Sequence, residues 1–220
     1  MRRAPGDTAA MVGRIIETDL CVIEGAQWLA RAEPRFARAL ALTGPLPLRR
    51  NTDGFGALLS AIVGQQVSVA SANAVWARLE GAGMIDAAAM AVASDEALRA
   101  LGLSRQKARY GRALAQAGLD YAALRSQPDE AVIATLTQVP GIGRWTAEIY
   151  AMFALGRADV FAPGDLAMQE AARVLFELPA RPSERDLRTM ALEWSPWRAV
   201  AARLLWAYYQ TAKQREGIRE

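Results

Sequence analysis

The sequence of 220 residues contains no histidine and a single cysteine, Cys21. A disulfide framework, a zinc finger and a cysteine-bound iron–sulfur cluster are therefore excluded, and so is any mechanism that uses histidine as acid or base. No apolar run reaches the ~18 residues that a membrane helix needs, and the first residues do not form a signal-peptide pattern. The chemistry must therefore use carboxylates, amides, hydroxyls, backbone groups or aromatic rings.

Lysine is also scarce. Only Lys107 and Lys213 are lysines, so 24 of the 26 basic residues are arginines. Arginine can bind phosphate through two parallel hydrogen bonds, although codon bias is an alternative source of this skew. The net charge of +3 permits nucleic-acid binding but does not demonstrate it.

Helices are expected throughout, because no alternating β-branched run exceeds about three residues. The expected fold class is all-α. Helices are expected at 19–31, 34–42, 53–64, 68–79, 97–101, 104–117, 144–155, 166–177 and 196–214. Capping boxes at Ser126–Asp129 and Ser183–Asp186 predict two further helix starts, the first with a helix that ends near Thr137. Residues 1–16 are expected to be frayed, and linkers are expected at 45–47 and 180–182.

The last predicted helix carries one apolar stripe and one unusual aromatic. The stripe consists of Trp197, Val200, Ala201, Leu204, Leu205 and Tyr208. Trp206 points nearly opposite to it, on the same side as Arg203, Gln210 and Lys213. A large aromatic on a polar face indicates either contact with a second lobe or a stacking surface that faces a cleft.

The strongest local signal is residues 136–147, which read LTQVPGIGRWTA. A Pro-Gly pair that ends at Gly141 predicts a tight turn, and Ile142 can anchor that turn in the core. Gly143 allows another backbone to come close, and the following helix presents unpaired N–H groups that suit an anion. Arg144 adds a positive side chain there. The alternative is an ordinary corner between two helices.

This stretch resembles the helix-hairpin-helix motif of DNA-binding proteins, in which backbone amides of the hairpin hold a DNA phosphate. The phosphate contacts that the resemblance implies are those of Gly141, Gly143, Arg144 and Thr146. The resemblance also implies a sodium or potassium ion that bridges the hairpin to phosphate when DNA is bound. Its implied ligands are the backbone carbonyls of Thr137, Val139 and Ile142. No other cofactor is expected.

About twenty residues further on, the segment 159–165 (DVFAPGD) ends at Asp165, directly before a predicted helix. Taken alone, Asp165 is an ordinary N-cap. A helix-hairpin-helix followed by a Gly/Pro-rich loop and an aspartate, however, resembles the signature of the helix-hairpin-helix (HhH-GPD) DNA glycosylase superfamily. Residues 64–70, 101–108 and 194–198 are similar to its 3-methyladenine DNA glycosylase II branch. Only about fifty residues precede the similar region, so the chain looks like a short form without the N-terminal β-rich lobe.

The resemblance implies a DNA glycosylase of base excision repair that flips a damaged nucleotide out of the duplex and hydrolyses its glycosidic bond. Asp165 would stabilise the positive charge on the sugar, an interaction of about 4 kcal/mol at ~4 Å and an effective dielectric of ~20. Bifunctional members of the superfamily use a lysine where this chain has Trp145. We therefore expect a monofunctional enzyme for alkylated bases of the 3-methyladenine and 7-methylguanine type. The alternatives are a non-catalytic helix-hairpin-helix DNA-binding module and a bifunctional glycosylase/AP lyase.

The resemblance also implies a base pocket and a DNA wedge. Trp206 and Trp145 would provide aromatic faces for a cationic base, with packing under the hairpin as the alternative for Trp145. Gln66 and Gln65 would fill the gap left in the base stack, with a solvated helix end as the alternative. Ile149 stands where the family has an aromatic residue, and Ala207 also replaces one. Both changes imply a more open pocket.

Two helical lobes that flank a DNA-binding cleft are implied within a single domain of residues 1–220. The central lobe would span about 53–155 and contain the hairpin at 136–147, and the second lobe would combine about 17–52 with 156–220. The expected partner is double-stranded DNA with alkylated bases. We expect a monomer that is cytoplasmic, nucleoid-associated and without a membrane partner.

Overall fold

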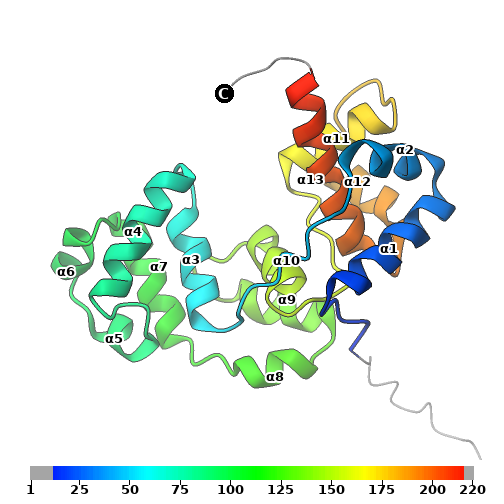
Figure 1. Ribbon diagram of the computed structural model, residues 1–220. Coiled ribbons are helices and arrows are strands. Elements are labelled where there is room, and N and C mark those ends of the chain that lie inside the picture. Colours follow the sequence, from blue (N-terminus) through cyan, green and yellow to red (C-terminus); the bar gives the residue numbers. More distant parts are fainter. Residues whose placement is uncertain (1–11, 216–220) are drawn as a thin grey trace, which may run out of the picture.

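A computed structural model describes residues 12–215 of the chain (Figure 1). Over this range the chain forms thirteen α-helices and one 3-10 helix, and the only β-structure is an isolated bridge between Ile15 and Arg157. The all-α fold class is therefore confirmed. The helices are α1 (Asp19–Ala32), α2 (Pro34–Thr43), α3 (Phe55–Gly64), α4 (Val69–Gly81), α5 (Ala87–Val92), α6 (Asp95–Ala100), α7 (Arg105–Gln116), α8 (Tyr121–Ser126), α9 (Asp129–Thr137), α10 (Arg144–Phe153), α11 (Leu166–Leu175), α12 (Glu184–Met190), η1 (Ala191–Trp194) and α13 (Arg198–Arg215).

Serine caps begin several of the predicted helices. At four starts the serine hydroxyl accepts a hydrogen bond from the backbone N–H three residues further on, at 3.1–3.2 Å. These serines are Ser68, Ser94, Ser104 and Ser183. Because such a bond satisfies an N–H that has no partner within the helix, the local sequence fixes these helix starts.

The predicted capping box at Ser126–Asp129 is wrong. Helix α9 begins at Asp129 after Pro128, without a side-chain cap. The hydroxyl of Ser126 instead donates to the Ala123 carbonyl at 2.9 Å, at the end of the preceding helix. The sequence patterns missed α5 and α8, since each has only six residues, too few to show a helical period.

The expectation of a frayed N-terminus is wrong for residues 14–16, and residues 1–11 lie outside the described range. Ile16 is completely buried, and its N–H donates to the Gly156 carbonyl at 2.7 Å. The Arg14 carbonyl accepts from the Ala158 N–H at 3.0 Å. The loop after α10 supplies the hydrogen bonds of this extended segment. A helical period in the sequence could therefore not reveal it.

Helices from distant parts of the sequence pack together. Helix α13 contacts α1, α2 and α11, whereas α7 contacts α3 and α5, and α9 contacts α10. In Figure 1, α3 to α7 lie on one side, α1, α2 and α11 to α13 lie on the other, and α8 to α10 lie between them. The exact lobe boundaries stay a prediction. No helix among residues 12–215 is both long and apolar enough to cross a membrane.

The linker before α3 is held against the rest of the chain by polar contacts. Gly54 donates its N–H to the Tyr150 hydroxyl at 3.0 Å, and Arg203 donates to the Leu48 carbonyl at 2.9 Å. The expectation that Arg203 lies on a polar face of the last helix is wrong, because its side chain is only 1% exposed. Burial lowers the pKa of Arg203 to about 10. The backbone carbonyls of Leu48 and Ala199 accept hydrogen bonds from this guanidinium.

Candidate functional site

The hairpin between α9 and α10 has the predicted turn. The Ile142 N–H donates to the Val139 carbonyl at 3.0 Å, which closes a four-residue turn. Gly141 has a φ of +93°, a value that glycine adopts easily. The Ile142 side chain is buried in the core. Its apolar packing fixes the turn from below, as the sequence predicts.

The two glycines of the hairpin differ in how much room there is for a side chain at their positions. A Cβ atom on Gly141 would lie 2.4 Å from Cγ of Tyr110, so packing within the chain excludes a larger residue there. Gly143 has an ordinary φ of −82°, and a Cβ there would meet nothing within 4 Å. The fold therefore explains Gly141 but does not explain Gly143. A close approach by another molecule would explain the second glycine.

Helix α10 begins next to this open surface. Gly143 is its N-cap, so no side chain accepts from the first N–H groups of the helix. Arg144 and Trp145 are exposed, and Thr146 is buried. The uncapped N–H groups and the helix dipole together favour an anion at this position.

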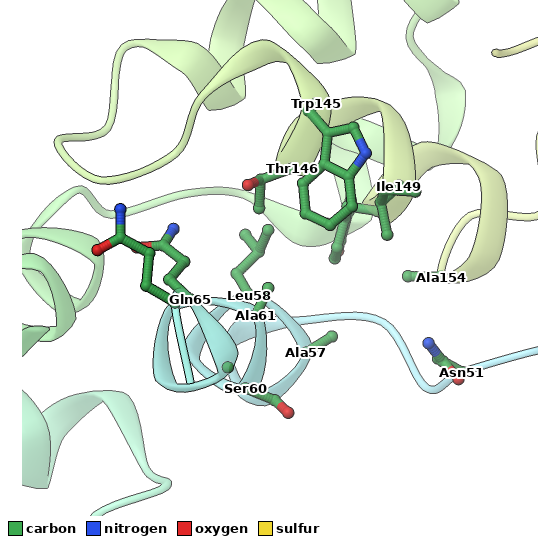
Figure 2. Close-up of a pocket in the computed structure, with 13 residues that line it drawn as sticks. Asn51, Ala57, Leu58, Ser60, Ala61, Gln65, Trp145, Thr146, Ile149 and Ala154 are labelled. Atoms are coloured by element: carbon green, nitrogen blue, oxygen red, sulfur yellow. The ribbon is translucent and has the colours of Figure 1, made fainter. Parts of the chain in front are cut away.

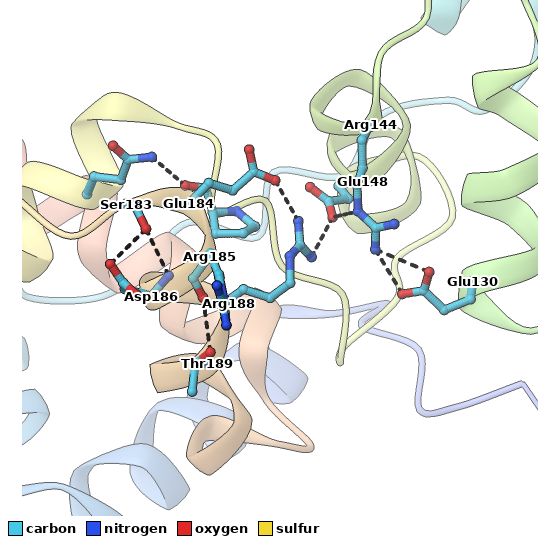
Figure 3. A network of polar contacts seen from close by, with 11 residues as sticks. Glu130, Arg144, Glu148, Ser183, Glu184, Arg185, Asp186, Arg188 and Thr189 are labelled. Atoms are coloured by element: carbon cyan, nitrogen blue, oxygen red, sulfur yellow. Dashed lines mark hydrogen bonds and ion pairs between the residues drawn. The ribbon is translucent and has the colours of Figure 1, made fainter.

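Arg144 belongs to a chain of ion pairs that Figure 3 shows. Its guanidinium contacts Glu130 at 3.0 Å and Glu148 at 2.9 Å. Arg188 of α12 contacts Glu148 at 2.8 Å and Glu184 at 3.0 Å. In this structure Arg144 thus binds two carboxylates. Its contact with phosphate stays a prediction and would compete with Glu130, whose side chain is exposed.

Glu148 is the centre of this network, and the sequence reasoning missed it. Its side chain is only 1% exposed, and Oε2 has no hydrogen-bond partner within the described range of 12–215. Burial raises the pKa of Glu148, and hydrogen bonds from Arg188 and Arg144 oppose that rise. A glutamate between apolar neighbours in a buried helix was the signal that could have identified it. The network connects α10 to α12.

A pocket of about 560 Å³ lies between α3 and α10, within the usual ~300–1,000 Å³ range of ligand sites (Figure 2). It is lined by Asn51, Ala57, Leu58, Ser60, Ala61, Gly64, Gln65, Gln66, Trp145, Thr146, Ile149, Tyr150 and Ala154. Trp145 is 43% exposed, so its indole is accessible rather than packed under the hairpin.

The two predicted pocket tryptophans have different surroundings. Trp145 lines the pocket, whereas Trp206 is not among the lining residues. Trp206 is half-buried, with its ring centroid 5.7 Å from that of Phe153. Phe153 directly precedes Ala154 of the pocket wall. Trp206 therefore contacts a ring that adjoins the pocket wall in sequence, without lining the pocket itself.

Asp165 is the N-cap of α11. Its Oδ1 accepts from the N–H groups of Ala167 at 3.0 Å and Met168 at 3.1 Å. Oδ2 has no hydrogen-bond partner among residues 12–215, and the residue is half-buried. One carboxylate oxygen thus caps the helix, while the other is available for chemistry.

The loop before Asp165 lies beside the pocket tryptophan. Asp165 does not itself line the pocket. The ideal Cβ position of the neighbouring Gly164 lies 3.7 Å from Cδ1 of Trp145, so the loop backbone reaches the edge of that indole. Gln169 of α11 donates to the Pro163 carbonyl at 2.8 Å and fixes the loop from its other side.

The two glutamines predicted to form the wedge also differ. Gln65 follows the end of α3, and its Nε2 donates to the Gly141 carbonyl of the hairpin at 2.9 Å. Gln66 is exposed and has a φ of +55°, the left-handed conformation that residues other than glycine rarely adopt. Of these two glutamines, Gln65 is therefore bonded to the hairpin, whereas the side chain of Gln66 is not.

The carbonyls predicted to bind a monovalent cation fit such an ion chemically. The Val139 carbonyl accepts the Ile142 N–H, while the carbonyls of Thr137 and Ile142 have no hydrogen-bond donor among residues 12–215. Backbone carbonyl oxygens are suitable ligands for sodium and potassium. These oxygens would hold the ion at the hairpin, and its presence stays a proposal.

An all-helical fold with a glycine hairpin, an uncapped helix start and an adjacent pocket defines a class of helix-hairpin-helix proteins. Comparison with known proteins identifies the superfamily within this class. The profile described as "HhH-GPD superfamily base excision DNA repair protein" matches residues 59–197. The chain belongs to this superfamily.

Individual relatives show the same likeness. DNA-3-methyladenine glycosylase 2 of Escherichia coli is 34% identical over 168 residues, which cover 70% of this chain and 57% of that protein. The crystal structure of a DNA-3-methyladenine glycosidase from Bacillus halodurans is similar with a TM-score of 0.78 and 31% identity, covering 86% of this chain and 91% of that one. The 3-methyladenine DNA glycosylase of Schizosaccharomyces pombe, in complex with abasic DNA, has a TM-score of 0.73 and 28% identity, covering 83% and 95%. The matches to the first curated relatives cover only 39% and 54% of their length.

Proposed function

We propose that this protein is a monofunctional DNA glycosylase that removes alkylated purines, of the 3-methyladenine and 7-methylguanine type, from duplex DNA. The observation that carries this proposal is the juxtaposition of three features. Asp165 has a carboxylate oxygen without a partner among residues 12–215, its loop lies beside Trp145, and Trp145 lines a pocket next to the hairpin. The names of the E. coli and S. pombe relatives support the substrate class.

The reaction needs a nucleotide that has been flipped out of the stack. The bond between C1′ of the sugar and the purine nitrogen breaks, and its electron pair goes to the base. Alkylation has already made that base cationic, so it leaves as a neutral molecule without a proton from the protein. A general acid is therefore unnecessary, which agrees with a chain that has no histidine.

Asp165 has its role on the sugar. Loss of the base leaves positive charge on the sugar, and a carboxylate at ~4 Å stabilises it by about 4 kcal/mol at an effective dielectric of ~20. Water then adds to C1′, and its proton passes to Asp165 or to solvent. The products are the free base and an abasic site.

The aromatic wall selects the cationic base. The exposed face of Trp145 attracts a positively charged ring through its π-electrons. Trp206 contributes through its contact with Phe153, the residue that precedes Ala154 of the pocket wall. The hairpin grips a phosphate through the backbone N–H groups near Gly143, and this contact carries no base preference.

The monofunctional assignment follows from the positions of the lysines. A lyase needs a lysine amine that reaches the sugar. Trp145 stands at the position of that lysine, and no lysine lines the pocket among residues 12–215. Lys107 donates to the Val63 carbonyl at 2.7 Å, away from Asp165 in both the sequence and its contacts.

Release of free base is the decisive test. The purified protein is incubated with methylated duplex DNA, and the released bases are separated by chromatography. Free 3-methyladenine or 7-methylguanine together with abasic sites is expected, with no protein–DNA adduct after borohydride reduction. DNA binding without release would indicate a non-catalytic module, and a trapped adduct would indicate a glycosylase/lyase. Either result would overturn the proposal.

A further inference from the structure

Lys107 occupies a distinctive position for one of only two lysines in the chain. It lies on α7, and its Nζ donates to the carbonyl of Val63, near the end of α3, at 2.7 Å. The last carbonyls of a helix have no partner within the helix, and a positive charge is favourable there. Lys107 therefore stabilises the C-terminal end of α3, directly before the loop that carries Gln66.

Gln65 holds the same helix end from a second side. It directly follows α3, and its Nε2 donates to the Gly141 carbonyl at 2.9 Å. This bond joins two segments that are 76 residues apart in sequence. The α3–α4 loop is thus fixed both to α7 and to the hairpin.

Helix α7 also touches the hairpin directly. Tyr110 follows Lys107 by three residues, so both side chains lie on one side of the helix. The Tyr110 ring packs against Gly141 so closely that a Cβ on that glycine would lie 2.4 Å away. Gln106 donates to the Tyr110 hydroxyl at 2.7 Å and orients the ring. The end of α3, the hairpin turn and α7 therefore contact one another in pairs.

Gln66 is the exposed residue that this arrangement holds. Its φ of +55° is unfavourable for a residue with a side chain, and such a conformation persists only where neighbouring contacts determine it. Two contacts hold the chain just before Gln66. Gln65 donates to the Gly141 carbonyl, and Lys107 donates to the Val63 carbonyl at the end of α3.

We infer that Lys107 and Gln65 are positioning residues that hold Gln66 ready to enter the base stack, at a fixed distance from the phosphate-binding hairpin. The inference rests on the proposed function, since it concerns the wedge of the same site. Gln65, which the resemblance places in the wedge, acts here through its bond to the hairpin, and Lys107 is assigned no contact with the sugar or base. Their loss impairs base flipping, while phosphate binding at Gly143 and the chemistry at Asp165 are retained.

The test uses the full-length variants Lys107→Met and Gln65→Leu. Gln116→Leu is the control, because Gln116 is an exposed residue of the same α7 whose Nε2 makes only a 3.4 Å contact with the Ala91 carbonyl. One measurement is single-turnover excision of 7-methylguanine, first paired in a duplex and then in an unpaired bubble. The other is the fluorescence of 2-aminopurine next to the lesion, which rises when the stack opens.

We expect excision from the paired duplex to fall about tenfold in both variants, and excision from the bubble to change less than about twofold in Lys107→Met, whose side chain does not line the pocket. The rise in 2-aminopurine fluorescence at saturating protein should fall together with excision from the paired duplex. Duplex affinity should stay unchanged, and the control variant should behave like the wild type. Lys107→Arg should recover most of the loss, since arginine can also donate to the Val63 carbonyl.

An equal loss on paired and unpaired substrates would overturn the inference, because it would indicate general damage to the site. Wild-type rates on both substrates would also overturn it. Failure of the proposed function is a separate result, in which wild-type protein releases no base. In that case the fluorescence measurement still decides, and a rise in the variants as large as in the wild type would contradict the positioning role.

Discussion

The hairpin and the Asp165 loop are supported in different ways. The hairpin is fixed by apolar packing of Ile142 and by the Tyr110 ring against Gly141, and the groups that it offers to DNA are backbone amides. The Asp165 loop is fixed by hydrogen bonds to α11, and the group that it offers is a single carboxylate. The difference teaches that hairpin changes should affect binding to all DNA, whereas loop changes should affect only the chemistry.

The two regions meet at α10. Its first turn carries Trp145, which lies beside the Asp165 loop at Gly164. Its second turn carries Glu148, which connects through Arg188 to Glu184 on α12. The ideal Cβ position of Gly164 also lies 3.3 Å from Oε2 of Glu184. The ion-pair chain therefore links α10, which follows the hairpin, to α12, which lies beside the Asp165 loop.

The largest effect is expected for Asp165→Asn. Asparagine caps helices about as well as aspartate, so the fold is retained while the charge is lost. Excision of 7-methylguanine should fall by at least about two orders of magnitude, and duplex affinity should not fall. Single-turnover kinetics and a binding titration measure the two effects.

A matched control exists in Asp86, the N-cap of α5. Its Oδ1 accepts from the N–H groups of Ala88 and Ala89, the same pattern as at Asp165. Asp86→Asn should leave both activity and binding unchanged. If Asp165→Asn keeps most of its activity, Asp165 is only a cap, and the contrast between the two regions disappears.

The next effect separates the two tryptophans. Trp145→Ala should reduce excision of cationic bases about thirtyfold, because a desolvated cation–π contact contributes about 2 kcal/mol. Trp206→Ala should have a smaller effect, since Trp206 does not line the pocket and contacts Phe153, whose neighbour Ala154 does. The difference between the two variants is measured as excision rates on a cationic and on a neutral damaged base. The comparison uses variants of equal thermal stability. A larger loss for Trp206→Ala would exchange the two roles.

Gly143→Asp probes the hairpin itself. Aspartate is a better N-cap than glycine, and a Cβ at this position meets open space, so thermal stability should stay the same or rise. Affinity for every duplex sequence should fall about tenfold, because the new carboxylate faces phosphate. Titrations with damaged and undamaged duplexes test this expectation. A loss confined to damaged DNA would show that Gly143 contacts the lesion rather than the backbone.

The smallest effect concerns the ion-pair chain. Burial raises the pKa of Glu148, so the folded protein holds this proton more tightly than the unfolded chain. The stability contribution is present below the ordinary carboxyl pKa and is lost as pH rises through the raised pKa. Glu148→Gln removes this dependence. Its melting temperature should therefore improve relative to the wild type between acidic and neutral pH, and a decline would mean that the arginine contacts outweigh burial.

Several features were predictable from sequence because their causes are local. Serine caps marked four helix starts, and a Pro-Gly pair marked the hairpin turn. The N-cap geometry of Asp165 was also a local matter. Non-local contacts caused the errors. Ser126 bonds backward rather than forward, and residues 14–16 pair with a loop that lies more than a hundred residues further on.

The sequence by itself determined the longer helices, the hairpin turn and the position of one aspartate at the start of a helix, because caps, turns and periodicity act over a few residues. Only the tertiary structure decided that Trp145 rather than Trp206 lines the pocket, that Arg203 is buried, and that Gln65 binds the hairpin. Packing between distant helices sets these contacts. A helical period gives the direction of a side chain, but the neighbouring helix decides what that side chain meets.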